Sequence, residues 1–139
     1  MDASIRTEFS IYLAQRPGEL AGVLDALSTV GVDLHAVCVV DQNSRGLVRL
    51  LGEPEERVRE VFESLVEAGA GPVLETPVLA VSSENRPRLL RDVAAKLALA
   101  GVNVQHAYSG SAPGREGRGE CVFRVSDLRQ AVETIGSMT

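Results

Sequence analysis

The stretch ENRPRLLRDVAAKLALAGVNVQHAYSG, residues 84–110, decides the fold because an earlier part of the chain repeats its pattern. The earlier copy is AQRPGELAGVLDALSTVGVDLHAV, residues 14–37. When Arg16 and Pro17 are placed on Arg86 and Pro87, the apolar residues that follow also coincide. Leu20 falls on Leu90, Val23 on Val93, Leu27 on Leu97, Gly31 on Gly101 and Asp33 on Asn103. The chain contains one unit twice, and its function is to be sought where the two copies meet.

The first copy predicts a strand, a helix and a second strand in close succession. Residues 6–14 alternate apolar and polar side chains, which is typical of a half-buried strand. Pro17 suits the first position of a helix, and apolar residues then recur at helical spacing up to Val30. Gly31 is the residue that a helix C-terminus prefers, and it precedes a second strand over 32–40.

The remaining segments complete two repeats of the same order. The first repeat continues with a strand at 47–51, a helix at 57–69 and a strand in the first part of 72–81, whose second part opens the second repeat. The second repeat continues with a helix at 87–100, strands at 102–109 and 120–125, and a helix at 127–137. This order predicts an α+β protein made of two ferredoxin-like βαββαβ repeats, 5–75 and 76–139, each with an antiparallel sheet and its helices on one face.

The second repeat has no room for its own final strand. Gly119 corresponds to Gly46, and by the same offset the last helix would end beyond residue 139. An open sheet edge is a hazard that folded proteins cover. We expect this edge to be covered either by a homodimer partner or by a sheet that extends across the two repeats.

Composition excludes several classes of protein. The chain has 139 residues, 45% of them hydrophobic and 24% charged, with a net charge of −5. An acidic chain with few aromatics is unlike a nucleic-acid-binding protein, and no apolar run is long enough to span a membrane. The N-terminal MDASIRTEF lacks the apolar core of a signal peptide. We expect Cys38 and Cys121 to be buried free thiols, and we expect the protein to be cytoplasmic. We expect no metal and no cofactor.

These motifs resemble a known family. The pattern NRP followed by Leu-Leu, an apolar helix and AGVNV, matched by RPGEL and VGVDL in the first copy, is similar to the ACT domain. The resemblance implies a regulatory module without catalytic activity that binds a small amino acid at the seam between two repeats or two subunits. The implied mechanism also includes a protein partner that responds to the bound ligand.

The resemblance also implies which residues bind. In this family the ligand contacts the loop before the first helix and the start of the second strand. The second repeat is most similar to the serine-binding regulatory module of phosphoglycerate dehydrogenase. Its implied ligand-binding residues are Ser83, Asn85, Arg88, Leu89 and Asn103. Those of the first repeat are Gln15, Gly18, Glu19, Leu20 and Asp33.

The second repeat departs from the family pattern at two of these positions. Ser83 stands where the family has a His, and Arg88 stands where it has a loop Gly. In the first repeat, Asp33 suits an ammonium group but has no donor for a carboxylate. The two repeats therefore predict two chemically different half-sites.

An amide side chain suits a zwitterion because it both donates and accepts hydrogen bonds. The N-terminus of the adjacent helix adds free N–H groups for a carboxylate. A structural role is the alternative, in which Asn85 is a turn or capping residue and Asn103 a strand-edge residue.

Two other functions remain open beside the amino-acid sensor. A small acylphosphatase-like enzyme has the same fold, with Arg16 or Arg86 and Asn103 imitating its phosphate site. Its loop would have to circle a phosphate, and the loop here is short and interrupted by Pro. A structural interaction module with a degenerate pocket is the other alternative, and Arg88 in place of Gly supports it.

Overall fold

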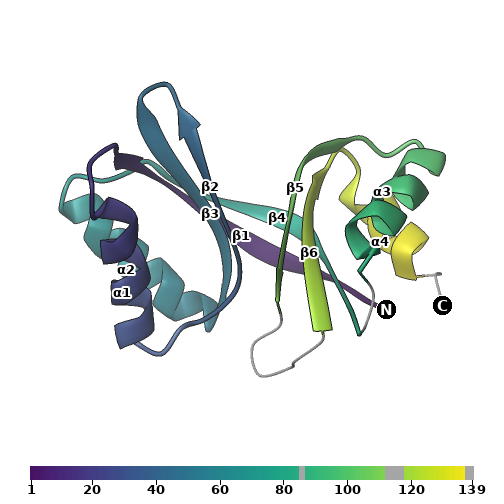
Figure 1. Cartoon of the computed structure of the whole chain (residues 1–139), viewed down its shortest axis with the longest axis horizontal. Helices are drawn as coiled ribbons and strands as arrows, with labels where there is room; N and C mark the ends of the chain where they lie inside the picture. The colour runs from purple at the N-terminus through teal and green to yellow at the C-terminus, as the bar shows by residue number, and fades with distance from the viewer. Residues whose placement is uncertain (85–86, 112–117, 137–139) are drawn as a thin grey trace. The chain divides into compact units, whose positions relative to one another are not determined.

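A computed structural model describes residues 1–84, 87–111 and 118–136, which form six strands and four helices (Figure 1). The strands are β1 (Asp2–Ala14), β2 (Asp33–Gln42), β3 (Arg45–Glu53), β4 (Val73–Glu84), β5 (Val104–Ser111) and β6 (Arg118–Val125). The helices are α1 (Glu19–Thr29), α2 (Glu55–Glu67), α3 (Leu89–Leu99) and α4 (Leu128–Gly136). The elements have the order predicted from the two repeats, which confirms the α+β ferredoxin-like class.

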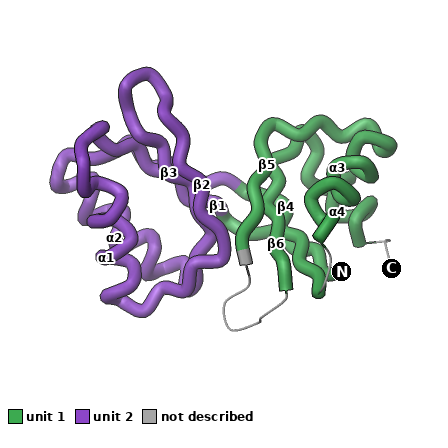
Figure 2. The backbone as a smooth tube through the Cα atoms, viewed as in Figure 1, with its two compact units in different colours: residues 1–7, 77–139 green, residues 8–76 purple. Residues whose placement is uncertain are grey.

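The chain folds into two compact units, residues 8–76 and residues 1–7 together with 77–139 (Figure 2). The division passes through both long strands: β1 and β4 each contribute one part to each unit. The repeats expected from the sequence were 5–75 and 76–139, and the compact units in addition place residues 1–7 with the second copy.

In the unit of residues 8–76, the strand order is β2-β3-β1-β4. Both β1 and β2 pair antiparallel with β3, and Ile11 lies opposite Val48. Because side chains alternate along β1, its apolar residues share the face of the sheet on which α1 and α2 lie. The core between this face and the two helices contains Phe9, Ile11, Leu13, Val23, Leu27, Val32, Val48, Leu50, Val58 and Phe62.

The turn between β1 and α1 depends on Gly18. This residue immediately precedes α1 and has a φ of 91°, in the left-handed region that a side chain disfavours. Its carbonyl accepts the first helical hydrogen bond, from the Gly22 N–H at 2.9 Å. Gly22 itself lies inside the helix, with open space where a Cβ would stand. The two glycines therefore have different physical roles.

In the unit of residues 1–7 and 77–139, the strand order is β1-β4-β6-β5. Both β4 and β5 pair antiparallel with β6, and α3 and α4 lie on one face. The core contains Leu79, Val81, Leu89, Val93, Leu97, Val102, Cys121, Phe123, Ala131 and Ile135. Cys121 is a buried free thiol as expected, whereas Cys38 in the other unit is free but only half-buried.

The N-terminal segment takes the place of the strand that the second repeat lacks. No strand follows α4 in the part of the chain that is described, and β1 lies beside β4 instead. Met1 and Ala3 pack against the core of this unit. Arg118 donates hydrogen bonds to the Asp2 carboxylate and, at 3.0 Å, to the Ser82 hydroxyl, so it links β6 to both β1 and β4. The chain thus covers this sheet edge with its own residues, which is the second of the two expectations.

We expect opposite effects from alanine at the two glycines of the α1 turn. Gly18→Ala places a Cβ at positive φ and should lower the free energy of unfolding by about 1 kcal/mol. Gly22→Ala should raise it by about 0.5–1 kcal/mol, because Ala is the better helix former. Urea denaturation measures both, and equal effects of the two variants would contradict the assigned geometry.

Removal of the N-terminal segment tests its role in the second sheet. A variant that lacks residues 2–7 should expose the β4 edge, so that backbone amides between Val78 and Ser83 exchange their hydrogens faster. Amides of β2 in the other unit serve as the internal control. Unchanged protection of 78–83, measured by hydrogen–deuterium exchange, would show that β1 does not complete this sheet.

Candidate functional site

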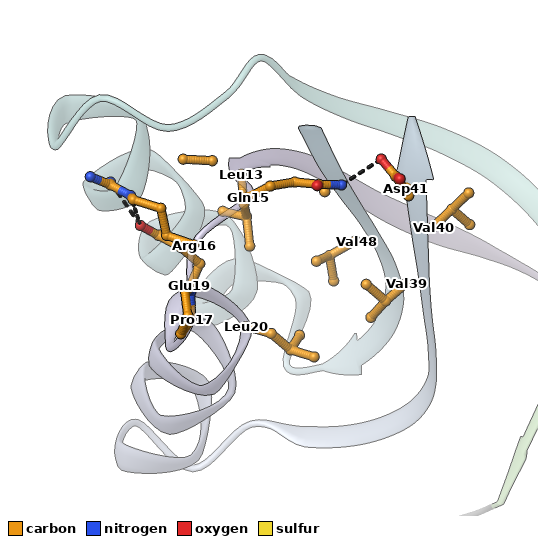
Figure 3. Close-up of a pocket in the computed structure, with 12 residues that line it drawn as sticks. Leu13, Gln15, Arg16, Pro17, Glu19, Leu20, Val39, Val40, Asp41 and Val48 are labelled. Atoms are coloured by element: carbon orange, nitrogen blue, oxygen red, sulfur yellow. Dashed lines mark hydrogen bonds and ion pairs between the residues drawn. The ribbon is translucent and has the colours of Figure 1, made fainter. Parts of the chain in front are cut away.

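A pocket of about 380 Å³ lies beside the turn between β1 and α1, in the unit of residues 8–76 (Figure 3). We call it the turn pocket. Its lining comes from the end of β1, the turn, the first residues of α1, and the hairpin of β2 and β3. The lining residues are Leu13, Ala14, Gln15, Arg16, Pro17, Glu19, Leu20, Val39, Val40, Asp41, Gly46 and Val48.

Strand register brings these segments together. Gly46 of β3 lies opposite Leu13 of β1 on one side and opposite Asp41 of β2 on the other. The β2–β3 hairpin closes with Asn43 and Ser44, which have φ values of 52° and 64°. Two consecutive residues with positive φ are typical of a type I′ turn, whose twist matches that of the strands. The hairpin end therefore lies beside the β1–α1 turn.

The floor of the turn pocket is apolar. Val39 lies opposite Val48, which belongs to the core on the helix-covered face, so Val39 shares that face. It is nevertheless 49% exposed. Val40, the next residue of β2, points to the opposite face (Figure 3). Leu20 of α1 and Leu13 of β1 approach the same space from the helix and the strand (Figure 3).

Polar groups lie at the rim of the pocket. The Gln15 side-chain amide donates a hydrogen bond to the Asp41 carboxylate, across the space between the turn and the hairpin (Figure 3). An amide is uncharged, so this bond does not neutralise Asp41. On the other side, Arg16 donates to Glu19 at 2.8 Å through Nη2 and 3.2 Å through Nε, and this pair balances its own charge.

The N-terminus of α1 opens beside the same rim. No side chain caps this helix, since Gly18 occupies the capping position. The first turn of a helix has backbone N–H groups without helical acceptors, together with the positive end of the helix dipole. The rim therefore offers an acceptor for a cation at Asp41 and donors for an anion at α1.

A second pocket, of about 450 Å³, lies on the opposite side of the turn and is bounded by the end of α2. It shares the turn residues with the turn pocket and includes Gly18, Gly22 and Leu65. The predicted site residues of the first repeat are thereby divided. Gln15 and Leu20 line the turn pocket, Gly18 lines the second pocket, and Glu19 lines both.

Asp33 lies away from both pockets within its unit. It begins β2 and pairs in register with Glu53 at the end of β3, whereas the hairpin at Asp41 is at the other end of the same strand. Because a strand rises about 3.3 Å per residue, roughly 25 Å separates the two ends. The unit does not bring Asp33 and Gln15 into one pocket.

The predicted residues of the second repeat have varied environments. Ser83 is buried in β4 opposite Gly119, and Leu89 is a core residue with 2% exposure. Arg88 is exposed just before α3. The backbone of Asn103 exchanges hydrogen bonds with Ser126: its N–H donates to the hydroxyl at 3.0 Å, and its carbonyl accepts from the Ser126 N–H at 2.9 Å. Asn85 lies outside the described residues.

Sequence analysis missed the hairpin side of the pocket, namely Val39, Val40, Asp41 and Val48. The available signal was the ferredoxin-like strand order, which puts the third strand of each repeat between the first and the second. That order places the β2–β3 hairpin next to the end of β1.

Within the described residues there is no group of three or more His, Cys, Asp or Glu side chains that could hold a metal ion. None of the described helices is long and apolar enough to cross a membrane.

Known proteins were compared with the chain at the level of sequence family and of structure. A family model described as an ACT domain pair matches residues 4–137. No curated protein sequence matches the chain.

Among solved structures, protein BT0572 from Bacteroides thetaiotaomicron is 23% identical, with a TM-score of 0.77 over 96% of this chain and 88% of that one. The ligand-free regulatory subunit of aspartate kinase from Thermus thermophilus is 13% identical, with a TM-score of 0.65 over 98% and 96%. The corresponding subunit from Thermus flavus is 14% identical, with a TM-score of 0.58 over 98% and 95%. At these identities the structures show a shared fold.

The two thiols should differ in reactivity. Burial raises the pKa of the Cys121 thiol to about 11, and the nearby Glu120 carboxylate adds to this rise. Because the thiolate is the reactive form, at pH 8 Cys121 should react roughly tenfold or more slowly than the half-buried Cys38. Alkylation followed by peptide mass spectrometry measures both, with the unfolded protein as control. Fast labelling of Cys121 in the folded protein would contradict its core position.

Proposed function

The chain belongs to the ACT domain pair family, and we propose that it is a non-catalytic regulatory protein whose ligand is a small free amino acid. The observation that carries this proposal is the turn pocket, where a hydrogen-bond acceptor for a cation and donors for an anion border an apolar floor. We assign ligand contact to Gln15, Glu19, Leu20 and Asp41.

A free amino acid matches the arrangement of groups at the rim. Its ammonium group pairs with the Asp41 carboxylate and with the Gln15 side-chain oxygen, since the Gln15 amide nitrogen is already bonded to Asp41. Its carboxylate accepts hydrogen bonds from the uncapped N-terminus of α1. The side chain then points to the apolar floor. A ligand with one charge would use only half of this rim.

An enzyme of the acylphosphatase type fits the described residues less well. Such a site needs a free guanidinium to hold a phosphate, and Arg16 is bonded to Glu19 by two hydrogen bonds. Asn103 lies at the start of β5 in the other unit, where its backbone is bonded to Ser126. These contacts favour regulation over catalysis.

Regulation requires that a bound ligand changes what another molecule recognises. We propose that the protein works in the cytoplasm as a homodimer and that a protein partner responds to ligand binding. The regulatory subunits of aspartate kinase among the structural neighbours support such a role, since they share the fold over nearly the whole chain. Light scattering at micromolar concentration checks the homodimer, and a monomer would contradict it.

The proposal is tested by a thermal-shift screen against the twenty amino acids. A ligand present at one hundred times its dissociation constant should add about 2.7 kcal/mol to the free energy of unfolding. That gain should raise the melting temperature by several degrees. Asp41→Asn keeps the shape of the side chain and removes its charge, so it should abolish most of the shift.

Asp25→Asn is the matched control, because Asp25 is an exposed acid of α1 that does not line the turn pocket. The control should retain the full ligand shift. The absence of a shift with every amino acid would overturn the proposed function and favour an interaction module.

A further inference from the structure

The strand registers of the two units make their sites comparable residue by residue. Leu13 lies opposite Gly46 in one unit, and Ser83 lies opposite Gly119 in the other. Val39 lies opposite Val48, and Ser109 lies opposite Cys121. Equivalent positions of the two repeats therefore have the same strand partners. The residues at these positions can be compared directly.

The two repeats differ where the turn pocket has its apolar lining. Ser83 takes the place of Leu13, Ser109 that of Val39, Gly110 that of Val40 and Cys121 that of Val48. One backbone arrangement thus accepts small and polar residues at these positions. Leu13 and Val48 are buried core residues of the first unit, but the exposed Val39 is not required for its core.

One of these valines, Val39, also remains in contact with solvent on the pocket side of the sheet. Its side chain is 49% exposed, whereas Val40, the next residue of β2, points to the opposite face. Exposed apolar groups that line a concave surface are typical of a binding site, because a ligand gains free energy by covering them. The corresponding position of the second repeat, Ser109, has no such apolar group to cover.

The polar groups of the turn pocket all lie at its rim and none lies on its floor. Gln15 and Asp41 are joined at one side of the rim, and Arg16 and Glu19 at the other (Figure 3). A polar ligand side chain on this floor would lose its hydrogen bonds to water without replacement. With a volume of about 380 Å³, the pocket is at the small end of the range of ligand sites.

We infer that the ligand of the turn pocket is a free amino acid with an aliphatic side chain, of the size of valine, isoleucine or leucine. This inference rests on the proposed function and adds the class of ligand to it. Val39 and Leu20 contact the aliphatic group, with the buried Val48 and Leu13 beneath them, and Asp41 with Gln15 holds the ammonium group. The second repeat lacks the apolar residues for this selectivity.

The sharpest test compares valine with threonine, which have the same shape and differ by a methyl and a hydroxyl group. Isothermal titration of the whole chain should give a dissociation constant for valine at least about tenfold lower than for threonine. Serine and aspartate should bind more weakly still. The 2-oxo acid of leucine, which lacks the ammonium group, should bind at least about tenfold more weakly than leucine.

Variants at Val39 then locate the selectivity. Val39→Thr keeps the shape of a β-branched strand residue and should weaken leucine binding by about tenfold. Val39→Ser copies the residue of the second repeat and should act in the same direction. Val66→Thr is the matched control: Val66 is a 44% exposed valine of α2 that does not line the turn pocket, and leucine binding should not change.

The outcomes separate the two proposals. Tighter binding of a polar amino acid than of leucine would overturn the ligand class and leave the proposed function standing. An unchanged affinity for leucine in both Val39 variants, with their folding confirmed by circular dichroism, would also overturn it. No binding of any amino acid would overturn both proposals.

Discussion

The structure depends on the long strand β1, which, like β4, contributes residues to both compact units. The second repeat ends with α4 in the described part of the chain, and its sheet would have an open edge beside β4. Residues 1–7 of β1 lie in this unit, and residues 8–14 of the same strand lie in the unit of the first repeat. Neither unit has its four-strand order without its own part of β1.

The same strand connects this constraint to the candidate site. β1 ends at Ala14, and the next residues form the turn that borders the turn pocket. A ligand that orders this turn acts on the end of a strand whose beginning belongs to the other unit. Under the proposed function, β1 is the covalent connection through which ligand binding at the turn would act on the other unit.

Much of the fold could be predicted from the sequence because the two copies have the same hydrophobic periodicity. The helices predicted at 17–30 and 87–100 are α1 and α3, which the structure begins at Glu19 and Leu89. The first strand was predicted to begin at residue 6, whereas β1 begins at Asp2. Met1, Ala3 and Ile5 alternate with polar residues, but Thr7 interrupts the apolar series before Phe9. This part of β1 is also held by contacts such as that of Arg118 with Asp2. Hydrophobic periodicity indicates which residues are buried, but it does not show which strands pair with each other.

The site was harder to predict than the fold. The family pattern drew attention to the β1–α1 turn, and the structure places Gln15, Glu19 and Leu20 in one pocket there. The other wall comes from a hairpin more than twenty residues later, and only strand register brings Asp41 next to Gln15. Val39 and Val40 are apolar residues within a strand, and the sequence does not indicate that both are exposed.

The most direct test of the central claim is a titration of the ¹⁵N-labelled protein with leucine, followed by the chemical shifts of its backbone amides. We predict that the largest changes fall on residues 14–17, 19–20 and 39–41, which line the turn pocket, with smaller changes at the equivalent positions of the second repeat. Changes confined to the neighbourhoods of Asp33 and Asn103, or no changes at saturating leucine, would contradict the account.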